Sequence, residues 1–350
     1  MSSSGDAAAQ AGPPYPPTTA SLGLTPTNGV DTPISSVFVL LFIIAAVMHM
    51  TIFQRNRRRG HKFILSGLLF GLCMARITAN VMRIVWANYP RNARIAIAAS
   101  ILTNAGVLLL FVVNLILSQR ILRAYHPSVG WHSSVSIFFK LLYAIIVALL
   151  VMVIVSTVYS FYTLDAHIKS QLRDVQLFAS TFLAVLSFLP IPVLVFTLLL
   201  PRPPQTPVDE FGKKGSMRTK VLLVGFTAAI LALGAAFRAA VQYMPRPVSE
   251  PAWYHSKACY YCFIYLIEII CVYLYGLTRF DLRFHIPDGA SQPGHYSKGV
   301  PSSPHGADAD DQSASKNEKG AAETEGDVER QKERNWESNL RTELNRRESE

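Results

Sequence analysis

Long apolar stretches separated by short polar segments dominate the pattern along the 350 residues. Each is close to the roughly 20 residues that a helix needs to cross a bilayer. The Leu-Pro-Ile-Pro sequence at 189–192 lies within one of them, and its prolines remove backbone donors, so we predict a kink there. The pattern predicts an all-α polytopic membrane protein with seven transmembrane helices, at residues 34–53, 63–86, 95–118, 137–161, 175–199, 221–241 and 260–277.

The segments that flank these spans have three different compositions. Residues 1–33 are rich in Ala, Ser, Thr, Gly and Pro and are predicted to form a disordered tail. Residues 278–287 alternate bulky apolar with basic side chains, which is typical of an interfacial segment on a membrane surface. Residues 288–350 combine Gly, Ser, Pro and charge and are predicted to form a second disordered tail.

The distribution of basic residues predicts the orientation of the spans. The loops after the first, third and fifth spans carry 12 Lys and Arg, whereas the first 33 residues and the other loops carry 6. Basic loops are retained in the cytosol. We therefore expect the N-terminal tail to lie on the extracellular or lumenal side and the C-terminal tail in the cytosol.

The composition agrees with a membrane-embedded chain. Half of the residues are hydrophobic, 16% are charged, and the formal net charge is +10. Because the basic residues lie next to the apolar stretches, we expect membrane lipids as partners and no nucleic acid. The expected localisation is a multi-pass position in the plasma membrane or an endomembrane.

Two ionisable residues within the spans predict a contact between helices. Arg76 lies near the middle of the second span, and Glu268 is the only acidic residue within any predicted span. A lone charge in hydrocarbon costs about 2.5–3.5 kcal/mol even on lenient scales, so each group needs a partner. We predict an ion pair between Arg76 and Glu268, with a protonated, neutral Glu268 as the alternative.

Further polar residues occur within the same spans. Arg83 and Arg238 lie at similar depth near the outer surface, where they would either attract an anionic group or extend to the interface. Such residues serve as structural contacts between helices or line a ligand or substrate pathway. The predicted polar network comprises Arg76, Asn80, Arg83, Asn104, Asn114, Arg238, Gln242 and Glu268.

Catalytic signatures are absent from the sequence. It contains no carboxylate pair within the spans, no His-rich cluster and no glycine-rich phosphate loop. Cys259 and Cys262 form a Cys-x-x-Cys pair, but no His or further Cys accompanies them. We therefore predict a protein that is not an enzyme and needs neither a cofactor nor a metal.

Three stretches carry a resemblance to a known family: HMTIFQRNRRRGHKFILSGLLFGLCMARI at 49–77, QRILRAYHPSVGW at 119–131 and LSFLPIPVL at 186–194. They resemble fungal multispanning membrane proteins that share a domain of unknown function, over residues 34–287. More distantly, FRAAVQY before the last span resembles the fungal lipid-translocating exporter-like proteins. This chain has Gln242 where that resemblance implies an acidic residue.

The sequence leaves three functional hypotheses open. In the first, the bundle binds or translocates an amphiphilic or anionic small molecule or lipid, with Arg76 and Glu268 as a gated pair and Arg83 and Arg238 at the entrance. The second is a seven-helix receptor or sensor, and the third is a membrane scaffold. A continuous polar cavity would favour ligand binding, and a fully packed interior would favour a scaffold.

Overall fold

A computed structural model describes residues 12–15, 17–201 and 208–298. In this part of the chain, seven helical segments are long and apolar enough to cross a membrane, as the sequence predicts. They are α2 (Asp31–Arg58), α3 (Ile64–Asn88), α4 with α5 (Ala93–Ala105, Leu108–Tyr125), α7 (Ser133–Ser160), α8 with α9 (Ala166–Phe188, Pro190–Leu199), α10 (Met217–Tyr243), and α11, η2 and α12 (Lys257–Tyr260, Tyr261–Leu266, Ile267–Leu277).

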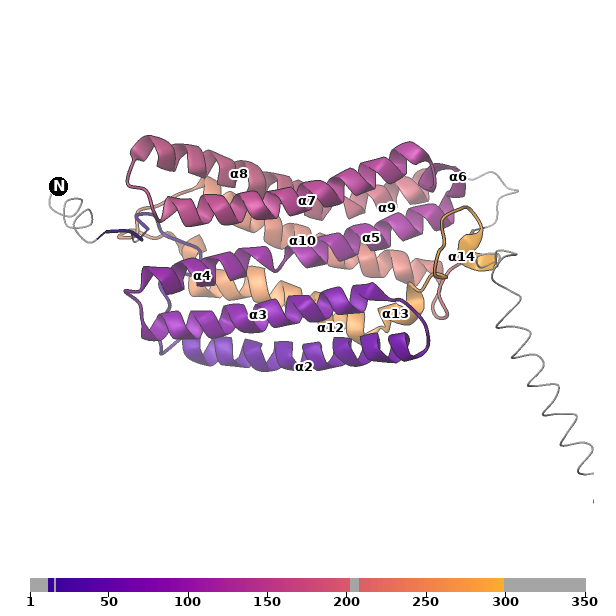
Figure 1. Ribbon diagram of the computed structural model, residues 1–350, viewed down its shortest axis with the longest axis horizontal. Helices are drawn as coiled ribbons and strands as arrows, with labels where there is room; N and C mark the ends of the chain where they lie inside the picture. Colours follow the sequence, from indigo (N-terminus) through magenta and orange to yellow (C-terminus); the bar gives the residue numbers. More distant parts are fainter. Residues whose placement is uncertain (1–11, 16, 202–207, 299–350) are drawn as a thin grey trace, which may run out of the picture. The chain divides into compact units, whose positions relative to one another are not determined.

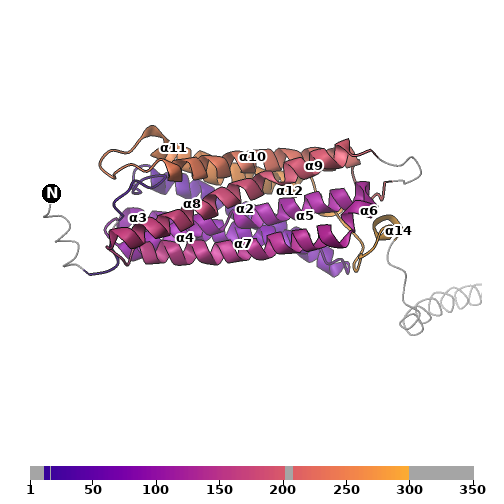
Figure 2. The ribbon, with the colours of Figure 1, turned by 90° about the horizontal axis from the view of Figure 1, so that it is seen from above.

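The seven segments run side by side along one common direction (Figures 1 and 2). Because short connections join them, successive segments alternate in direction. One end of the bundle, here called the Asp31 end, holds residues 17–30, 89–92, 161–165 and 244–256. The other, the Arg58 end, holds residues 59–63, 126–132 and 208–216. Two short helices lie in the connections: α6 (Pro127–Gly130) at the Arg58 end and η1 (Trp253–His255) at the Asp31 end.

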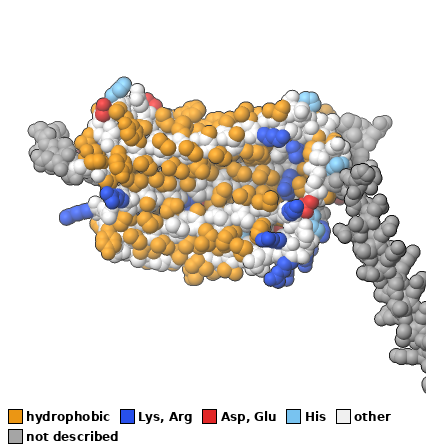
Figure 3. All heavy atoms as spheres, in the orientation of Figure 1, with side chains coloured by type: hydrophobic (Ala, Val, Ile, Leu, Met, Phe, Trp, Pro, Cys, Tyr) orange, Lys and Arg blue, Asp and Glu red, His pale blue; other side chains and the backbone are white. Residues whose placement is uncertain are grey.

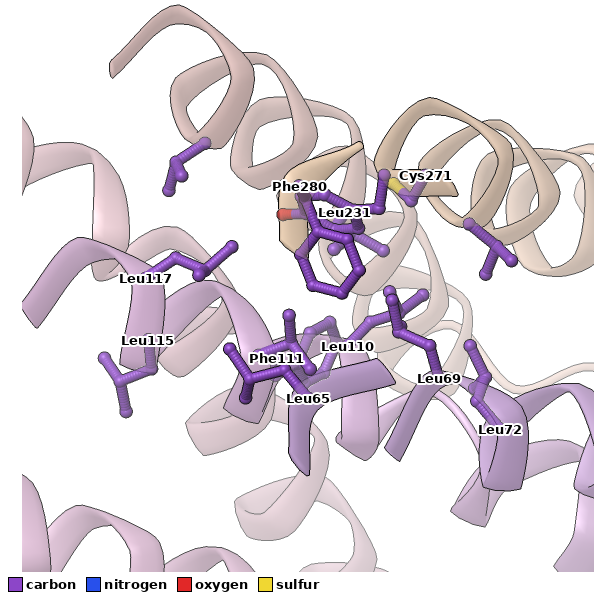
Figure 4. Packing of buried hydrophobic residues seen from close by; sticks show 14 of the residues in the cluster. Leu65, Leu69, Leu72, Leu110, Phe111, Leu115, Leu117, Leu231, Cys271 and Phe280 are labelled. Carbon is purple, nitrogen blue, oxygen red and sulfur yellow. The ribbon is translucent and has the colours of Figure 1, made fainter. Parts of the chain in front are cut away.

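The packed core of the bundle runs from Tyr261 near the Asp31 end to Phe280 near the Arg58 end. Leu69 and Leu72 of α3 pack there with Leu110 and Phe111 of α5, all at most 1% exposed (Figure 4). Apolar side chains also cover the outer flank of the helices, while Lys and Arg gather near the Arg58 end on the face shown in Figure 3. An apolar outer surface is what a lipid-facing bundle requires.

The third and fifth spanning segments are each divided into two α-helices, and the seventh changes to a π-helix over Tyr261–Leu266. The fifth is divided at Leu189, because α8 ends at Phe188 and α9 starts at Pro190, which confirms the predicted kink. The third is divided between Ala105 and Leu108, and the sequence pattern did not predict this break.

The structure differs from the prediction of a disordered tail over residues 1–33. Helix α2 starts at Asp31, and residues 17–30 pack against the Asp31 end. The Ala20 N–H donates to the Arg246 carbonyl at 2.8 Å, and the Gly23 N–H donates to the His255 carbonyl at 2.9 Å. These backbone hydrogen bonds and the packing of Leu22 against the core hold the segment, which is why its polar composition gave no sign of order. Residues 1–11 and 16 lie outside the described part.

The segment after the last span is folded into the Arg58 end instead of lying on the membrane surface as predicted. Helix α13 (Phe280–Arg283) follows a left-handed Arg279, and Phe280 and Phe284 are fully buried. The buried Asp281 carboxylate accepts hydrogen bonds from Asn56 of α2 at 3.0 Å and from Arg279 at 2.9 Å. Burial opposes ionisation of Asp281, but these donors hold its pKa below the usual value.

Part of the predicted C-terminal disordered tail is also ordered. The Asp209 carboxylate accepts the backbone N–H groups of Gly294, at 3.0 Å, and Ser297, at 2.8 Å. Ser297 belongs to the short helix α14 (His295–Lys298), and Tyr296 in the same turn is buried. The remainder of the predicted tail, residues 299–350, lies outside the described part.

Candidate functional site

Arg76 and Glu268 form an ion pair in the middle of the bundle. The Arg76 side chain on α3 donates from Nε to Glu268 Oε2 and from Nη2 to Oε1, the latter at 2.5 Å. Their side chains are 0% and 1% exposed. The two-pronged geometry joins the second and seventh spans and confirms the predicted pair.

The third nitrogen of Arg76 binds the end of α4. Nη1 donates to the carbonyls of Thr103 at 2.6 Å and Leu102 at 3.2 Å. These carbonyls are available because α4 ends at Ala105, and a cation at a helix C-terminus is favoured by the helix dipole. A Cβ on Gly106 would lie 2.9 Å from the Arg76 guanidinium carbon, so only glycine leaves room for it. Arg76 is therefore fully satisfied by the protein.

Arg83, two turns further along α3, pairs with Asp31. Its Nε and Nη2 donate to Asp31 Oδ1 at 3.1 and 2.9 Å, and Lys257 Nζ lies 2.6 Å from Asp31 Oδ2. The Asp31 carboxylate is fully buried and also accepts from the Tyr261 hydroxyl at 3.0 Å. The prediction that Glu268 is the only acidic residue within a span is therefore wrong, and Arg83 does not extend to the interface.

The ordered N-terminal segment completes the surroundings of Arg83. Arg83 Nη2 donates to the Gly23 carbonyl at 2.5 Å, and the Arg83 guanidinium lies 4.4 Å from the centre of the Tyr260 ring. The hydrogen bond from the Gly23 N–H to the His255 carbonyl holds the N-terminal segment in this place. His255 itself is 1% exposed. Burial lowers the pKa of His255, and nearby Arg246 lowers it further.

Arg238 on α10 lacks the protein partners that satisfy Arg76 and Arg83. Within the described chain no hydrogen bond or ion pair joins it to another residue, and its Nε is shielded from solvent without an acceptor. It lies within electrostatic range of Glu268 and Arg76. Since Arg76 occupies both oxygens of Glu268, the single carboxylate is already balanced and the charge of Arg238 is not.

Arg238 lines two adjoining cavities toward the Asp31 end. The polar cavity has a volume of about 400 Å³ and is lined by three arginines, Arg83, Arg173 and Arg238. The remaining polar wall includes Ser100, Asn104, Gln176 and Gln242, together with hydroxyl groups of Thr19, Ser21, Thr103 and Tyr260. No Asp or Glu is among the described residues that line it. A cavity of this size falls within the roughly 300–1,000 Å³ typical of small-molecule sites.

The apolar cavity, of about 270 Å³, adjoins the polar one. The two share Trp86, Ser100, Asn104, Arg238 and Gln242, so their walls are continuous. Beyond this shared wall the lining is mostly apolar, with Ile101, Leu108, Leu150, Val153, Ile154 and Leu183 drawn from three of the spanning segments, and Thr157, Ser160 and Ser180 as polar members. Together the two cavities form one site, with arginine side chains in its first part and mainly apolar side chains in its second.

The eight predicted residues do not form one continuous network. Asn80 donates to the Arg76 carbonyl at 2.9 Å and lines neither cavity. Asn114 belongs to a separate buried cluster, in which its Oδ1 accepts from Thr227 at 3.2 Å and from Tyr275. Arg83, Asn104, Arg238 and Gln242 line the polar cavity, and Arg76 and Glu268 form the closed pair behind it.

Several residues of the site were missed by sequence analysis. Asp31 was assigned to a tail, although an acidic residue two positions before Pro33 is a helix-start pattern. Trp86 was unremarkable in the sequence, yet its buried Nε1 has no acceptor in the described structure and it lines both cavities. Arg173 lies on the part of α8 that precedes the predicted fifth span at 175–199, so the hydrophobic pattern does not mark it.

The helices and their apolar surface define a multi-pass integral membrane protein. A family model described as a protein of unknown function, DUF3112, matches residues 208–285. The matched region includes Arg238, Gln242, Glu268 and the buried α13. A search of curated proteins and a search of solved structures each found no match.

Proposed function

We propose that this membrane protein binds an anionic amphiphile, with the anionic group at Arg238 and the apolar part in the adjoining apolar cavity. The observation that carries the proposal is the unpartnered guanidinium of Arg238 on the wall of two connected cavities. Arg238 is half-buried and its Nε is shielded from solvent, so its charge is partly desolvated without a counter-ion, and a bound anion would offset that cost. The apolar extension favours a ligand with a hydrocarbon portion over a simple ion.

The packing supports binding over a purely structural role for the bundle. The described cavities both lie in the Asp31 half, whereas the core toward the Arg58 end is filled by side chains such as Leu69 and Phe111. Movement of a ligand through the bundle would require the Arg76–Glu268 pair to separate. We therefore propose this pair as the closed gate of a translocation route, in line with the distant resemblance to lipid-translocating exporter-like proteins. The proposed role is non-enzymatic.

The charge asymmetry supports an orientation with the Asp31 end outside. Exposed basic residues gather at the Arg58 end, among them Arg55, Arg58 and Lys213. An epitope tag after Glu350 should survive protease added to intact cells. Digestion of the tag under those conditions would reverse the orientation.

Binding can be tested with two probes that differ only in charge. Purified protein in phosphatidylcholine nanodiscs would be titrated with oleate and with neutral monooleoylglycerol, and the shift in thermal unfolding temperature would be measured. We expect oleate to stabilise the protein and monooleoylglycerol to have little effect, because only oleate neutralises Arg238.

Two variants make this test specific. R238Q should lose the stabilisation by oleate, whereas R94Q, an exposed change at the same end of the bundle, should keep it. Equal stabilisation by both probes, or full stabilisation of R238Q by oleate, would overturn the proposed function.

A further inference from the structure

The charges around the polar cavity leave more than one arginine without a counter-ion. Asp31 is shared by Arg83 and Lys257, and Glu268 is taken by Arg76. Arg173 and Arg238 both line the cavity, and neither forms an ion pair with a described residue. Arg173 is exposed and Arg238 is half-buried, and a monovalent anion would balance only one of these two guanidiniums.

The wall also holds more hydrogen-bond donors than a carboxylate can use. Trp86 is 9% exposed, and its indole N–H finds no acceptor among the described residues. Arg238 Nε–H is likewise unpartnered, and both residues line both cavities. The amides of Gln176 and Gln242 share this wall. A phosphate monoester offers three strong acceptor oxygens and a charge of about −1.5 to −2 at neutral pH, whereas a carboxylate offers two oxygens and one charge.

The apolar cavity limits the rest of the ligand. Its volume of about 270 Å³ is below the roughly 300–1,000 Å³ of ordinary small-molecule sites. It is bordered by α4, α5, α7, α8 and α10, and its small volume favours one hydrocarbon chain over two.

From this charge surplus, the free donors and the narrow apolar cavity, we propose that the ligand is a single-chain amphiphile with a phosphate monoester headgroup. Arg238 and Trp86 bind the phosphate at the junction of the cavities, and Arg173 supplies the second positive charge. This inference rests on the proposed function and specifies the ligand of the same site.

The test compares probes that share one oleoyl chain. The affinities of oleoyl lysophosphatidate, oleoyl lysophosphatidylglycerol, oleate and monooleoylglycerol would be measured by calorimetry on protein in phosphatidylcholine nanodiscs. We expect lysophosphatidate to bind at least about tenfold more tightly than oleate or the singly charged diester. Dioleoyl phosphatidate, with two chains, and inorganic phosphate, with none, should each bind at least about tenfold more weakly than lysophosphatidate.

The pH dependence of these affinities separates charge from shape. The second ionisation of a phosphate monoester lies near pH 6. The ionisable groups that line the polar cavity are Arg83, Arg173, Arg238 and Tyr260, with no Asp, Glu or His among the described lining residues. Lysophosphatidate should therefore bind more tightly at pH 7.5 than at pH 5, and lysophosphatidylglycerol should not.

Arg173 provides the variant that distinguishes the two proposals. R173Q should weaken lysophosphatidate about three- to fivefold and leave oleate unchanged, because Arg173 is exposed, exposed ion pairs contribute up to about 1 kcal/mol, and oleate needs only Arg238. W86F should weaken lysophosphatidate, whereas W253F, which changes an exposed tryptophan, should not. R94Q serves again as the charge control.

The outcomes separate failure of this inference from failure of the proposed function. Equal affinity for lysophosphatidate and oleate, both above the neutral probe, would overturn the phosphate assignment and leave anionic binding in place. Binding of the two-chain lipid as tightly as lysophosphatidate would overturn the single-chain assignment. Equal binding of monooleoylglycerol, or no binding of any probe to folded protein, would overturn both proposals.

Discussion

Arg76 and Arg238 occupy similar sequence surroundings but very different structural ones. Each lies within an apolar spanning helix that is rich in small residues. Arg76 binds both oxygens of Glu268 and two carbonyls of α4, and it is fully buried. Arg238 faces two cavities and has no partner among the described residues. A guanidinium that the protein satisfies stabilises the fold, and one that it leaves unsatisfied is available to a ligand.

The largest effect is expected when the closed pair is broken. Arg76→Ala and Glu268→Ala each leave an uncompensated charge in the bundle, and each should lower the free energy of unfolding by about 3–5 kcal/mol. The double variant should lose less than the sum of the two, because the groups interact directly. Chemical denaturation in detergent measures all three values.

The control for this cycle is Arg94→Ala, an exposed change that should stay within about 0.5 kcal/mol of the unmodified protein. Strict additivity of the Arg76 and Glu268 substitutions would show that the two side chains do not stabilise each other.

A smaller effect is expected from crowding the same pair. Gly106→Ala would place a methyl group 2.9 Å from the Arg76 guanidinium carbon, which the two carboxylate bonds hold in place. The change should destabilise the protein by about 1–3 kcal/mol. Gly71→Ala, which meets nothing within 4 Å on α3, should instead stabilise it by about 0.5–1 kcal/mol. Thermal unfolding of the two variants gives the comparison, and equal effects would show that the space around Arg76 is not restricted.

The sequence predicts the spans well because a membrane makes hydrophobicity nearly decisive. It also predicts the Arg76–Glu268 pair, since one acidic residue lies inside an apolar stretch and one arginine at similar depth needs it. The kink at Leu189 follows from the local chemistry of proline. In each case one strong physical effect, namely hydrophobicity, the cost of a lone charge or the missing proline donor, determines the structure.

What the sequence could not predict depends on contacts between distant segments. Asp31 belongs to a polar stretch, and its burial becomes evident only when Arg83, Lys257 and Tyr261 converge on it. The order of residues 17–30 rests on backbone hydrogen bonds, which leave no compositional signal. Arg238 is free to bind a ligand because no described residue accepts its hydrogen bonds and because several helices form a cavity beside it. No local sequence pattern marks either feature.

The contrast between the two arginines is tested most directly by matched substitutions in ligand-free protein. The free energies of unfolding of R76Q and R238Q would be compared after exhaustive removal of bound lipid. We expect R76Q to be destabilised by several kcal/mol and R238Q to be as stable as the unmodified protein or more so, because its substitution removes a half-buried charge that the protein does not balance. Equal destabilisation of both variants would contradict this, since it would mean that the protein itself already satisfies Arg238.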